Sequence, residues 1–480
     1  MTLSMRRASV VAAVVAVLLA MSLADGAIGR AAPPPAATGM LQPASEVVPA
    51  GVGTSSWFCA GGSGPQAGGE ETVLIVDSTG VPVHGTVTAV PSKGRSRSQQ
   101  VTVPAGGTTS VVPARLSPGP WVSAIVQLDG AGVAVEESVA TPLGWAETPC
   151  ASSTSSSWFF ASGSTAGNDG IALSVLNPGV TPAVVDTTLT TASGAVLNPA
   201  AYQGVTVEPR SLVVEYLSDH DEGDASVAAT VTAVSGSVVA AELQSYTATG
   251  RTGVALDTGA PAAARHWAFP LTEEIAGAMV RFHVYDPGSR PARVTMSVGF
   301  AQGSASPISL TVPAHGARAV TAEHQSRLPV GTPYWVQFTS AAPAGIVVAR
   351  EVAGPAGGTG TPRHGLVLGT AAGARQWLLP AVTGPGTAPW ALGIVDLAGR
   401  PVTVRVTVAA AAPGSPPPAG SAIGPFRVAP GAPRVFAPAP PSPVGLAPIV
   451  VTATGPVAVE LDPEPIAAPG EVVLPAVPIG

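Results

Sequence analysis

The sequence has little charge, a single lysine and only two cysteines. Charged residues make up 11% of the 480 residues, against about 25% in an ordinary globular domain. Uncharged side chains and the backbone must therefore solvate the surface. The net charge is −7, and Lys93 and the arginines form no basic block. A nucleic-acid partner is not expected, because binding to phosphates depends on clustered cations.

Sustained helical periodicity and enzyme motifs are also missing from the sequence. The chain contains 56 Gly and 51 Pro, which disfavour long helices and favour many turns. It has no Gly-x-Ser-x-Gly element, no His-based or Cys-based metal spacing and no phosphate-binding glycine loop ahead of a helix. Asp257-Thr258-Gly259 matches the aspartic-protease triplet, but that mechanism uses two such aspartates. We interpret this triplet as a turn, and the chain as non-enzymatic.

One motif recurs four times at nearly constant spacing. A Trp is followed by a turn signature and then by a Pro, and the copies begin 101, 109 and 110 residues apart. The tryptophans are Trp57, Trp158, Trp267 and Trp377. The turns begin at Asp77, Asn177, Asp286 and Asp396 and end in Gly, a combination that supplies a side-chain acceptor and a positive φ. The repeat predicts four tandem domains of one type.

Each copy contains about seven short segments with the alternation typical of β-strands, as in residues 402–408. Seven strands per hundred residues, with regular turn signals, are typical of an immunoglobulin-like β-sandwich. The predicted fold is therefore all-β, with four tandem sandwich repeats. The predicted divisions are a signal or anchor segment 1–30, a Pro/Ala-rich spacer 31–50, and repeats at 51–150, 151–262, 263–372 and 373–480, the last with a Pro-rich loop at 409–424.

Three segments bear on the connections between repeats. Gly259-Ala260-Pro261 and residues 354–360 are rich in Gly and Pro and are predicted to be linkers. Residues 472–477 resemble the strand that begins at Trp377. We interpret them as a fifth copy of the Trp strand that caps the last domain.

The N-terminus reads as an export segment. Arg6 and Arg7 precede an uncharged run at residues 8–24. This run is long for a signal peptide and short for a membrane span, so a cleaved signal and a retained anchor both stay open. The protein is expected to be exported to the cell envelope or beyond, with membrane contact only through residues 8–24.

The two cysteines, Cys59 and Cys150, are predicted to form one disulfide, because an isolated pair in an exported protein is usually oxidised. A structural role is also expected for the four tryptophans and for a glutamate that follows each of them by 79 to 84 residues. These glutamates are Glu136, Glu242, Glu351 and Glu460. No catalytic residue and no bound organic cofactor is predicted.

One acidic loop is the single metal candidate. Asp219, Asp221, Glu222 and Asp224 lie within six residues of one another. Oxygen-rich loops between strands can hold Ca²⁺, which is abundant outside the cell. The alternative is a solvated loop, since the other repeats carry no equivalent cluster.

The first repeat begins with SSWFCAGG at residues 55–62. Together with Cys150 and the repeated Trp strands, this start resembles an exported actinobacterial family known only as a domain of unknown function. The resemblance implies an envelope protein and transfers no active site. The sequence predicts a non-catalytic binding or scaffolding array, with an envelope protein or glycan as partner. Alternative functions are an envelope-glycan hydrolase or accessory factor of surface glycan assembly, and a calcium-dependent adhesin.

Overall fold

The structure is a computed structural model, and the residues it describes belong to the part of the chain from Pro43 to Gly480. The described residues are 53–62, 68–221, 223–247, 252–273, 277–322, 325–355, 362–379, 390–408, 422–436, 448–463 and 474–479. The predicted signal segment and spacer lie outside them, as do residues 409–421 of the predicted loop. Within these ranges, no helix combines the length and the apolarity needed to cross a membrane.

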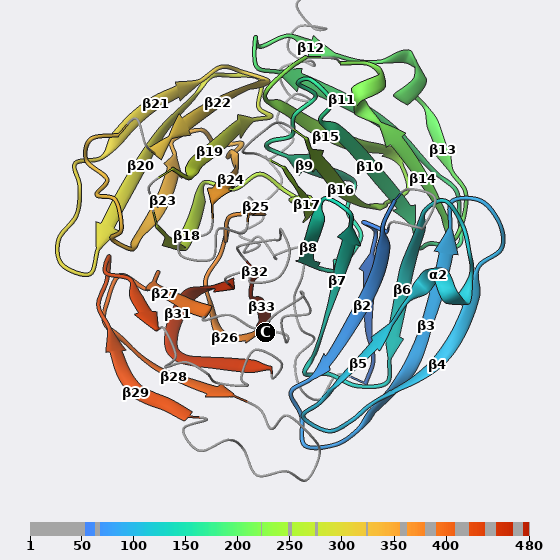
Figure 1. Ribbon diagram of the computed structural model, residues 1–480, viewed down its shortest axis with the longest axis horizontal. Coiled ribbons are helices and arrows are strands. Elements are labelled where there is room, and N and C mark those ends of the chain that lie inside the picture. Colours follow the sequence, from blue (N-terminus) through green and yellow to red (C-terminus); the bar gives the residue numbers. More distant parts are fainter. Residues whose placement is uncertain are drawn as a thin grey trace, which may run out of the picture. The chain divides into compact units, whose positions relative to one another are not determined.

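Repeat 1 is a sandwich of two four-stranded antiparallel sheets (Figure 1). The first sheet has the order β1 (Ser55–Cys59), β6 (Val122–Leu128), β3 (Val83–Pro91) and β4 (Arg97–Val103). The second has the order β5 (Thr108–Val111), β2 (Glu70–Asp77), β7 (Val133–Thr141) and β8 (Gly144–Pro149). A short helix, α2 (Pro113–Leu116), precedes β6. Apolar side chains of both sheets meet in one core.

Repeats 2 and 3 have the same two-sheet plan. In repeat 2 the first sheet comprises β9 (Ser157–Phe160), β15 (Val227–Ser235), β11 (Ala183–Thr191), β12 (Val196–Leu197) and β13 (Val205–Val207). Its second sheet has the order β14 (Ser211–Tyr216), β10 (Gly170–Asn177), β16 (Val239–Tyr246) and β17 (Gly253–Thr258). Repeat 2 also has two short helices, η2 (Ala200–Tyr202) and η3 (Leu217–Asp219).

Repeat 3 has two four-stranded sheets. The first has the order β18 (His266–Thr272), β23 (Tyr334–Ser340), β20 (Ala292–Phe300) and β21 (Ile308–Val312). The second has the order β22 (Gly316–Thr321), β19 (Met279–Asp286), β24 (Val347–Pro355) and β25 (Pro362–Leu368).

Repeat 4 follows the plan with one long strand shared between its two layers. Its strands are β26 (Ala374–Leu379), β27 (Trp390–Asp396), β28 (Val402–Val408), β29 (Ala422–Val428), β30 (Arg434–Phe436), β31 (Ile449–Pro463), β32 (Leu474–Pro475) and β33 (Val477–Ile479). The first half of β31 pairs with β26 and β28, and its second half pairs with β27 and β32.

The sandwich prediction is confirmed, and the described residues form eight strands in repeats 1, 3 and 4 and nine in repeat 2, against about seven predicted. The additional strand closes each repeat as β8, β17, β25 or β32 and pairs with the strand before it. The pairing of β2 with β5 and of β3 with β6 is that of an immunoglobulin constant domain. The outer strands are placed differently from those of an immunoglobulin domain, because β1 pairs with β6 and β7 pairs with β2, so each lies in the opposite sheet.

The four predicted turns share one hydrogen bond. In each, the side-chain Oδ1 of the first residue accepts from the backbone N–H two residues later, at N···O distances of 2.6–2.9 Å. The first residues are Asp77, Asn177, Asp286 and Asp396. The expected positive φ holds only at Gly399, so the side-chain bond rather than glycine geometry is the shared feature.

The repeat tryptophans are buried between the two sheets of their own repeats. In repeats 2 and 3 the indole Nε1 donates to the backbone carbonyl just before β16 or β24, and in repeat 4 it donates to a carbonyl in the second half of β31. The acceptors are Val238, Ile346 and Val457, at 2.8, 2.6 and 3.0 Å. Each of these tryptophans therefore ties one sheet of its repeat to the other.

The segment after each closing strand returns to the Trp strand of the same repeat. Residues 151, 260, 370 and 477 pair with residues 58, 159, 268 and 378 respectively. The C-terminal segment thus caps repeat 4 as predicted, but its interpretation as a fifth Trp strand is wrong, because Leu474–Pro475 is the closing strand of repeat 4 and Val477 pairs with β26. The predicted linker at 354–360 is also wrong at its start, since residues 354 and 355 belong to β24, which forms a hairpin with β25 inside repeat 3. Residues 356–361 lie outside the described part.

The closing strands bring the four repeats into a cycle of contacts. β8 contacts β17, β17 contacts β25, β25 contacts β32, and β32 contacts β8 (Figure 1). Leu378 and Val477 of repeat 4 belong to the hydrophobic core of repeat 1. The last repeat thus packs against the first, and each repeat has two neighbours.

Candidate functional site

The predicted disulfide is present and closes repeat 1. Cys59 on β1 and Cys150 after β8 are bonded, with Cα atoms 4.6 Å apart. In repeats 2 and 3 the matching pairs are a phenylalanine and a glycine. A Cβ added to Gly259 would lie 2.6 Å from the Phe160 ring, and one added to Gly369 would lie 2.8 Å from the Phe269 ring. An aromatic ring thus fills the space that the disulfide fills in repeat 1.

The two cysteine sulfurs and a carboxylate oxygen of Glu137 lie within 4.8 Å of one another. Among the described residues, this is the group of three atoms that could in principle bind a metal ion. Both sulfurs are consumed in the disulfide, so this group is not a metal centre in the oxidised protein. Glu137 accepts hydrogen bonds from the Gly61 N–H at 3.1 and 3.0 Å. Burial raises the pKa of Glu137 to about 8. The hydrogen bonds from the Gly61 N–H and from Glu71 lower this pKa and so oppose part of the rise.

The acidic loop brings two of its carboxylates together. Burial, followed by the nearby charge of Asp224, raises the pKa of Asp221 to about 6. Asp219 ends η3 and is exposed, while Glu222 lies outside the described residues. Among the loop residues that the structure describes, no three carboxylates converge within 4.8 Å. The described part of the loop therefore has the geometry of a carboxyl pair.

The four recurring glutamates are buried but do not occupy one register position. They pair with residues that lie three, four, five and three positions before the turn residue of their repeats. In order, the pairs are Glu136 with Leu74, Glu242 with Leu173, Glu351 with Arg281, and Glu460 with Gly393. Glu242 thus points to the opposite face of its sheet from the other three, because strand side chains alternate. The near-constant spacing from the Trp does not reflect structural equivalence.

In repeats 1 and 2 two of these glutamates face another acid. Burial raises the pKa of Glu136 well above its usual range, and the neighbouring Glu147 raises it further. Glu242 lies directly across from Asp257 in the β16–β17 pair, and both carboxyl groups have raised pKa values through burial. Asp257 is therefore a strand residue, and its prediction as a turn is wrong.

In repeats 3 and 4 the glutamates face histidine or arginine side chains. Glu351 contacts His283 Nε2 at 3.0 Å and His364 Nε2 at 3.5 Å. Glu460 of repeat 4 accepts from Arg350 Nη2 of repeat 3 at 2.5 Å and from the Leu271 N–H at 3.1 Å. Burial raises the pKa of Glu460, and the charge of Arg350 opposes that rise. These contacts join strands or whole repeats, which is a structural use of the acids.

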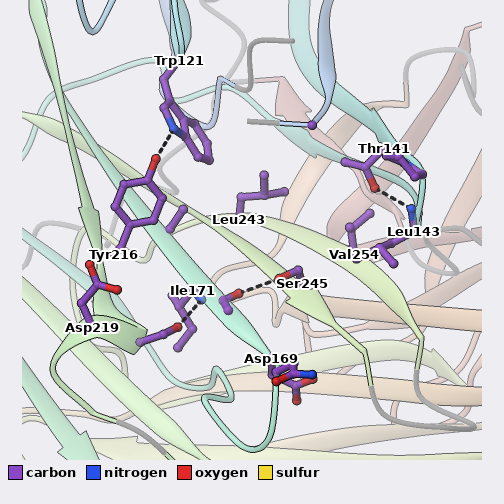
Figure 2. A pocket seen from close by; sticks show the side chains of 16 residues that line it. Trp121, Thr141, Leu143, Asp169, Ile171, Tyr216, Asp219, Leu243, Ser245 and Val254 are labelled. Carbon is purple, nitrogen blue, oxygen red and sulfur yellow. Dashed lines mark hydrogen bonds between the residues drawn. The ribbon is translucent and has the colours of Figure 1, made fainter. Parts of the chain in front are cut away.

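A cleft of about 650 Å³ lies between repeats 1 and 2 (Figure 2). Repeat 1 contributes Trp121, which immediately precedes β6, and residues 141–143 around the β7–β8 turn. Repeat 2 contributes residues 168–172 at the start of β10, and residues of β14, η3, β16 and β17. Ligand sites commonly have volumes of about 300–1,000 Å³ and mostly apolar walls, so the cleft is the candidate site of this protein.

An aromatic pair bridges the two repeats at the cleft. Trp121 Nε1 donates to the Tyr216 hydroxyl at 2.7 Å, and the two rings meet edge to face with centroids 6.2 Å apart (Figure 2). Trp121 is only 4% exposed, whereas Tyr216 is 45% exposed. Trp121 therefore anchors the pair, and Tyr216 presents an aromatic surface to solvent.

The charged residues of the cleft lining are both acids. Asp169 is buried, and its carboxylate accepts from the Ser164 hydroxyl at 2.8 Å and from the Thr247 N–H at 2.9 Å. Asp219, one of the predicted calcium ligands, lines the cleft with exposure to solvent. Among the lining residues that the structure describes, none is Lys, Arg or His.

Sequence reasoning missed this cleft. Trp121 is visible in the sequence only as the first residue of an alternating strand, and Tyr216 lies 95 residues further on. The sequence carries one usable signal. Tyr216 ends its strand next to the acidic loop, so an aromatic residue and Asp219 are neighbours before any folding is considered.

The chain belongs to a family of unknown function, DUF5719, whose model matches residues 129–416, more than half of the chain. No curated protein matches the sequence. Among solved structures, Thermotoga maritima 1070 is 15% identical, covers 22% of this chain and 94% of its own, and has a TM-score of 0.21. The Anabaena sensory rhodopsin transducer is 20% identical over 18% of this chain and 92% of its own, with a TM-score of 0.16.

A tetra-tandem repeat from the extending region of a large adhesion protein covers 90% of this chain and 99% of its own. It is 12% identical and has a TM-score of 0.10. All three TM-scores lie far below 0.5, so none of these likenesses bears on function.

Proposed function

We propose that this protein is an exported, non-catalytic binding and scaffolding protein of the cell envelope. The cleft between repeats 1 and 2 carries the proposal. It combines a mostly apolar wall with a few fixed polar groups. A concavity of this kind at a domain boundary is the usual form of a ligand site.

The packing of the repeats supports a scaffolding role. Hydrophobic clusters extend across the boundaries between repeats, as in the cluster of Val139 and Ala146 with Val254 and Leu256 below the cleft. Thr258 of repeat 2 also donates to the Pro149 carbonyl of repeat 1 at 2.9 Å. Because these contacts hold the two walls together, the cleft is expected to keep its shape when a ligand binds.

Export is supported by the disulfide and by the N-terminal segment. Disulfides persist in oxidising compartments and are rare in the cytosol. The positively charged start and the apolar run at 8–24 have the order of an export signal. A buried disulfide that closes repeat 1 fits a protein that works outside the cytoplasm.

The chemistry of the cleft favours binding over catalysis. A hydrolase needs a positioned acid–base pair. Asp169 in the cleft is held by Ser164 and Thr247, which gives its carboxylate a positioning role within the fold. An envelope-glycan hydrolase and a calcium-dependent adhesin are the alternatives that the experiment below must separate from this proposal.

The test is co-sedimentation of the purified full-length protein with isolated cell-envelope material. The wild type and Val180→Ala, which alters an exposed side chain outside the cleft, should sediment equally. Tyr216→Ala should bind at least tenfold more weakly, with or without calcium. Equal sedimentation of Tyr216→Ala and wild type would refute the cleft as the binding site. Release of soluble sugar from the envelope material would favour the hydrolase, and loss of binding on calcium removal would favour the adhesin.

A further inference from the structure

We infer that the cleft between repeats 1 and 2 binds a small apolar molecule that carries one positive charge, such as a primary amine or a quaternary ammonium. This inference rests on the proposed function, because it names the ligand class of the same site. It follows from three properties of the lining: its apolar walls, its charge and its exposed aromatic ring.

The walls suit an apolar body. Ile171 and Leu243 of repeat 2 line the cleft together with Leu143 of repeat 1, and Val254 lies beside Leu143 (Figure 2). Removing such apolar surface from water is the main source of affinity in a preformed pocket. The volume of about 650 Å³ limits the occupant to one small molecule.

The charge of the lining selects a cation. Asp169 and Asp219 are the charged residues of the described lining, and none of these described lining residues is basic. Asp169 is fixed on the β10 side by its bonds to Ser164 and Thr247, so it keeps its position when the cleft is filled. Asp219 is exposed, so an anionic ligand would bring a like charge beside its carboxylate, whereas a cation would gain from it.

Tyr216 supplies the third property. Its hydroxyl accepts the Trp121 N–H, which fixes the ring, and the ring stays 45% exposed. Figure 2 shows Tyr216 between Trp121 and Asp219. An aromatic face next to a carboxylate is the combination that binds an ammonium group by cation–π attraction and charge together.

A neutral glycan fits the lining less well. Sugar hydroxyls require many free polar partners, and several polar groups here are already engaged. Ser218 Oγ accepts the Ile171 N–H at 3.1 Å, and Thr141 Oγ1 accepts the Leu143 N–H at 3.1 Å (Figure 2). The apolar walls would also leave buried hydroxyls without partners, which costs binding energy.

The test uses three probes with one apolar body and different head groups: 4-phenylbutylamine, 4-phenylbutanol and 4-phenylbutyrate. Their affinities for the purified full-length protein are measured by calorimetric titration at neutral pH. We expect the amine to bind at least tenfold more tightly than the alcohol, and the butyrate to bind most weakly. Equal or reversed affinities, or no binding of any probe, would overturn the inference.

Two variants make the test specific. Asp219→Asn should weaken the amine three- to tenfold and leave the alcohol unchanged, because it removes charge from an exposed position without changing the wall. Glu208→Gln removes an exposed charge outside the cleft lining and should change neither affinity. An equal effect of Asp219→Asn on amine and alcohol would refute the charge argument. If the protein shows Tyr216-dependent binding to envelope material but no preference for the amine, the inference fails while the proposed function stands.

Discussion

Replacing Asp257 by Asn should stabilise the protein at neutral pH and have little effect at pH 4. Asp257 is 6% exposed and lies directly opposite Glu242 in the β16–β17 pair. Burial raises the pKa of Asp257 to about 8, and burial and the charge of Asp257 raise the pKa of Glu242. The folded protein therefore holds Asp257 in its neutral form at pH 7, and asparagine is a neutral side chain of nearly the same shape.

The size of the effect follows from proton linkage. In the unfolded chain an aspartate ionises at about pH 3.9, so between about pH 4 and pH 8 the unfolded state binds fewer protons than the folded state. The free energy of unfolding then falls as the pH rises, by about 1.4 kcal/mol per pH unit for this one group. The stability contributed by neutral Asp257 is complete below pH 4, and about 4 kcal/mol of it at most is lost by pH 7. Asp257→Asn removes this loss.

The assay is urea unfolding of the full-length, disulfide-bonded protein at pH 4, 5, 6, 7 and 8. The slope of unfolding free energy against pH should be less negative for Asp257→Asn than for the wild type by up to about 1.4 kcal/mol per unit. Glu208→Gln, which changes an exposed acid, controls for the loss of one charge from the chain. Parallel pH curves for Asp257→Asn and wild type, or a variant that is less stable at pH 7 than the wild type, would refute the reasoning.

Three further outcomes are expected. Cys59→Ser with Cys150→Ser should lower the unfolding free energy by about 4–5 kcal/mol, because the bond closes a loop with a sequence separation of 91 residues; thiol labelling of denatured, unreduced wild type should find no free cysteine, and two labelled thiols would contradict it. Arg350→Met should destabilise the protein by about 3–5 kcal/mol by leaving Glu460 buried without its cation, and adding Glu460→Gln should restore most of that loss, which a double-mutant cycle in urea would measure. A far-ultraviolet spectrum of the full-length protein should be dominated by β-structure, and substantial helix beyond the length of one N-terminal segment would contradict the fold.

Local features of the fold could be predicted from sequence because they depend on neighbouring residues. The alternation in residues 402–408 appears as β28, and the turn at Asp396 forms the predicted side-chain bond within two residues. The disulfide could be predicted because the chain offers only one pairing, Cys59 with Cys150. The four-repeat plan followed from the spacing of the tryptophans, which each repeat buries in its core.

The candidate site could not be predicted in the same way. Trp121 and Tyr216 are 95 residues apart, and their contact depends on how repeat 1 packs on repeat 2. The sequence shows Asp219 as one acid of a candidate calcium loop, whereas its place in the lining depends on η3 facing that same boundary. Contacts of this kind bring no sequence periodicity with them.

The sequence by itself determined the all-β class, the number of repeats, the shared turns and the cysteine pair, because alternation, turn chemistry and spacing are properties of short segments. Only the tertiary structure decided the register of the buried glutamates. A shift of one residue between paired strands moves a side chain to the other face of the sheet, yet it hardly changes the distance of that residue from the repeat Trp along the chain. The tertiary structure also decided that the closing strands meet in a cycle and that a cleft lies between repeats 1 and 2, because both depend on packing between residues far apart in the chain.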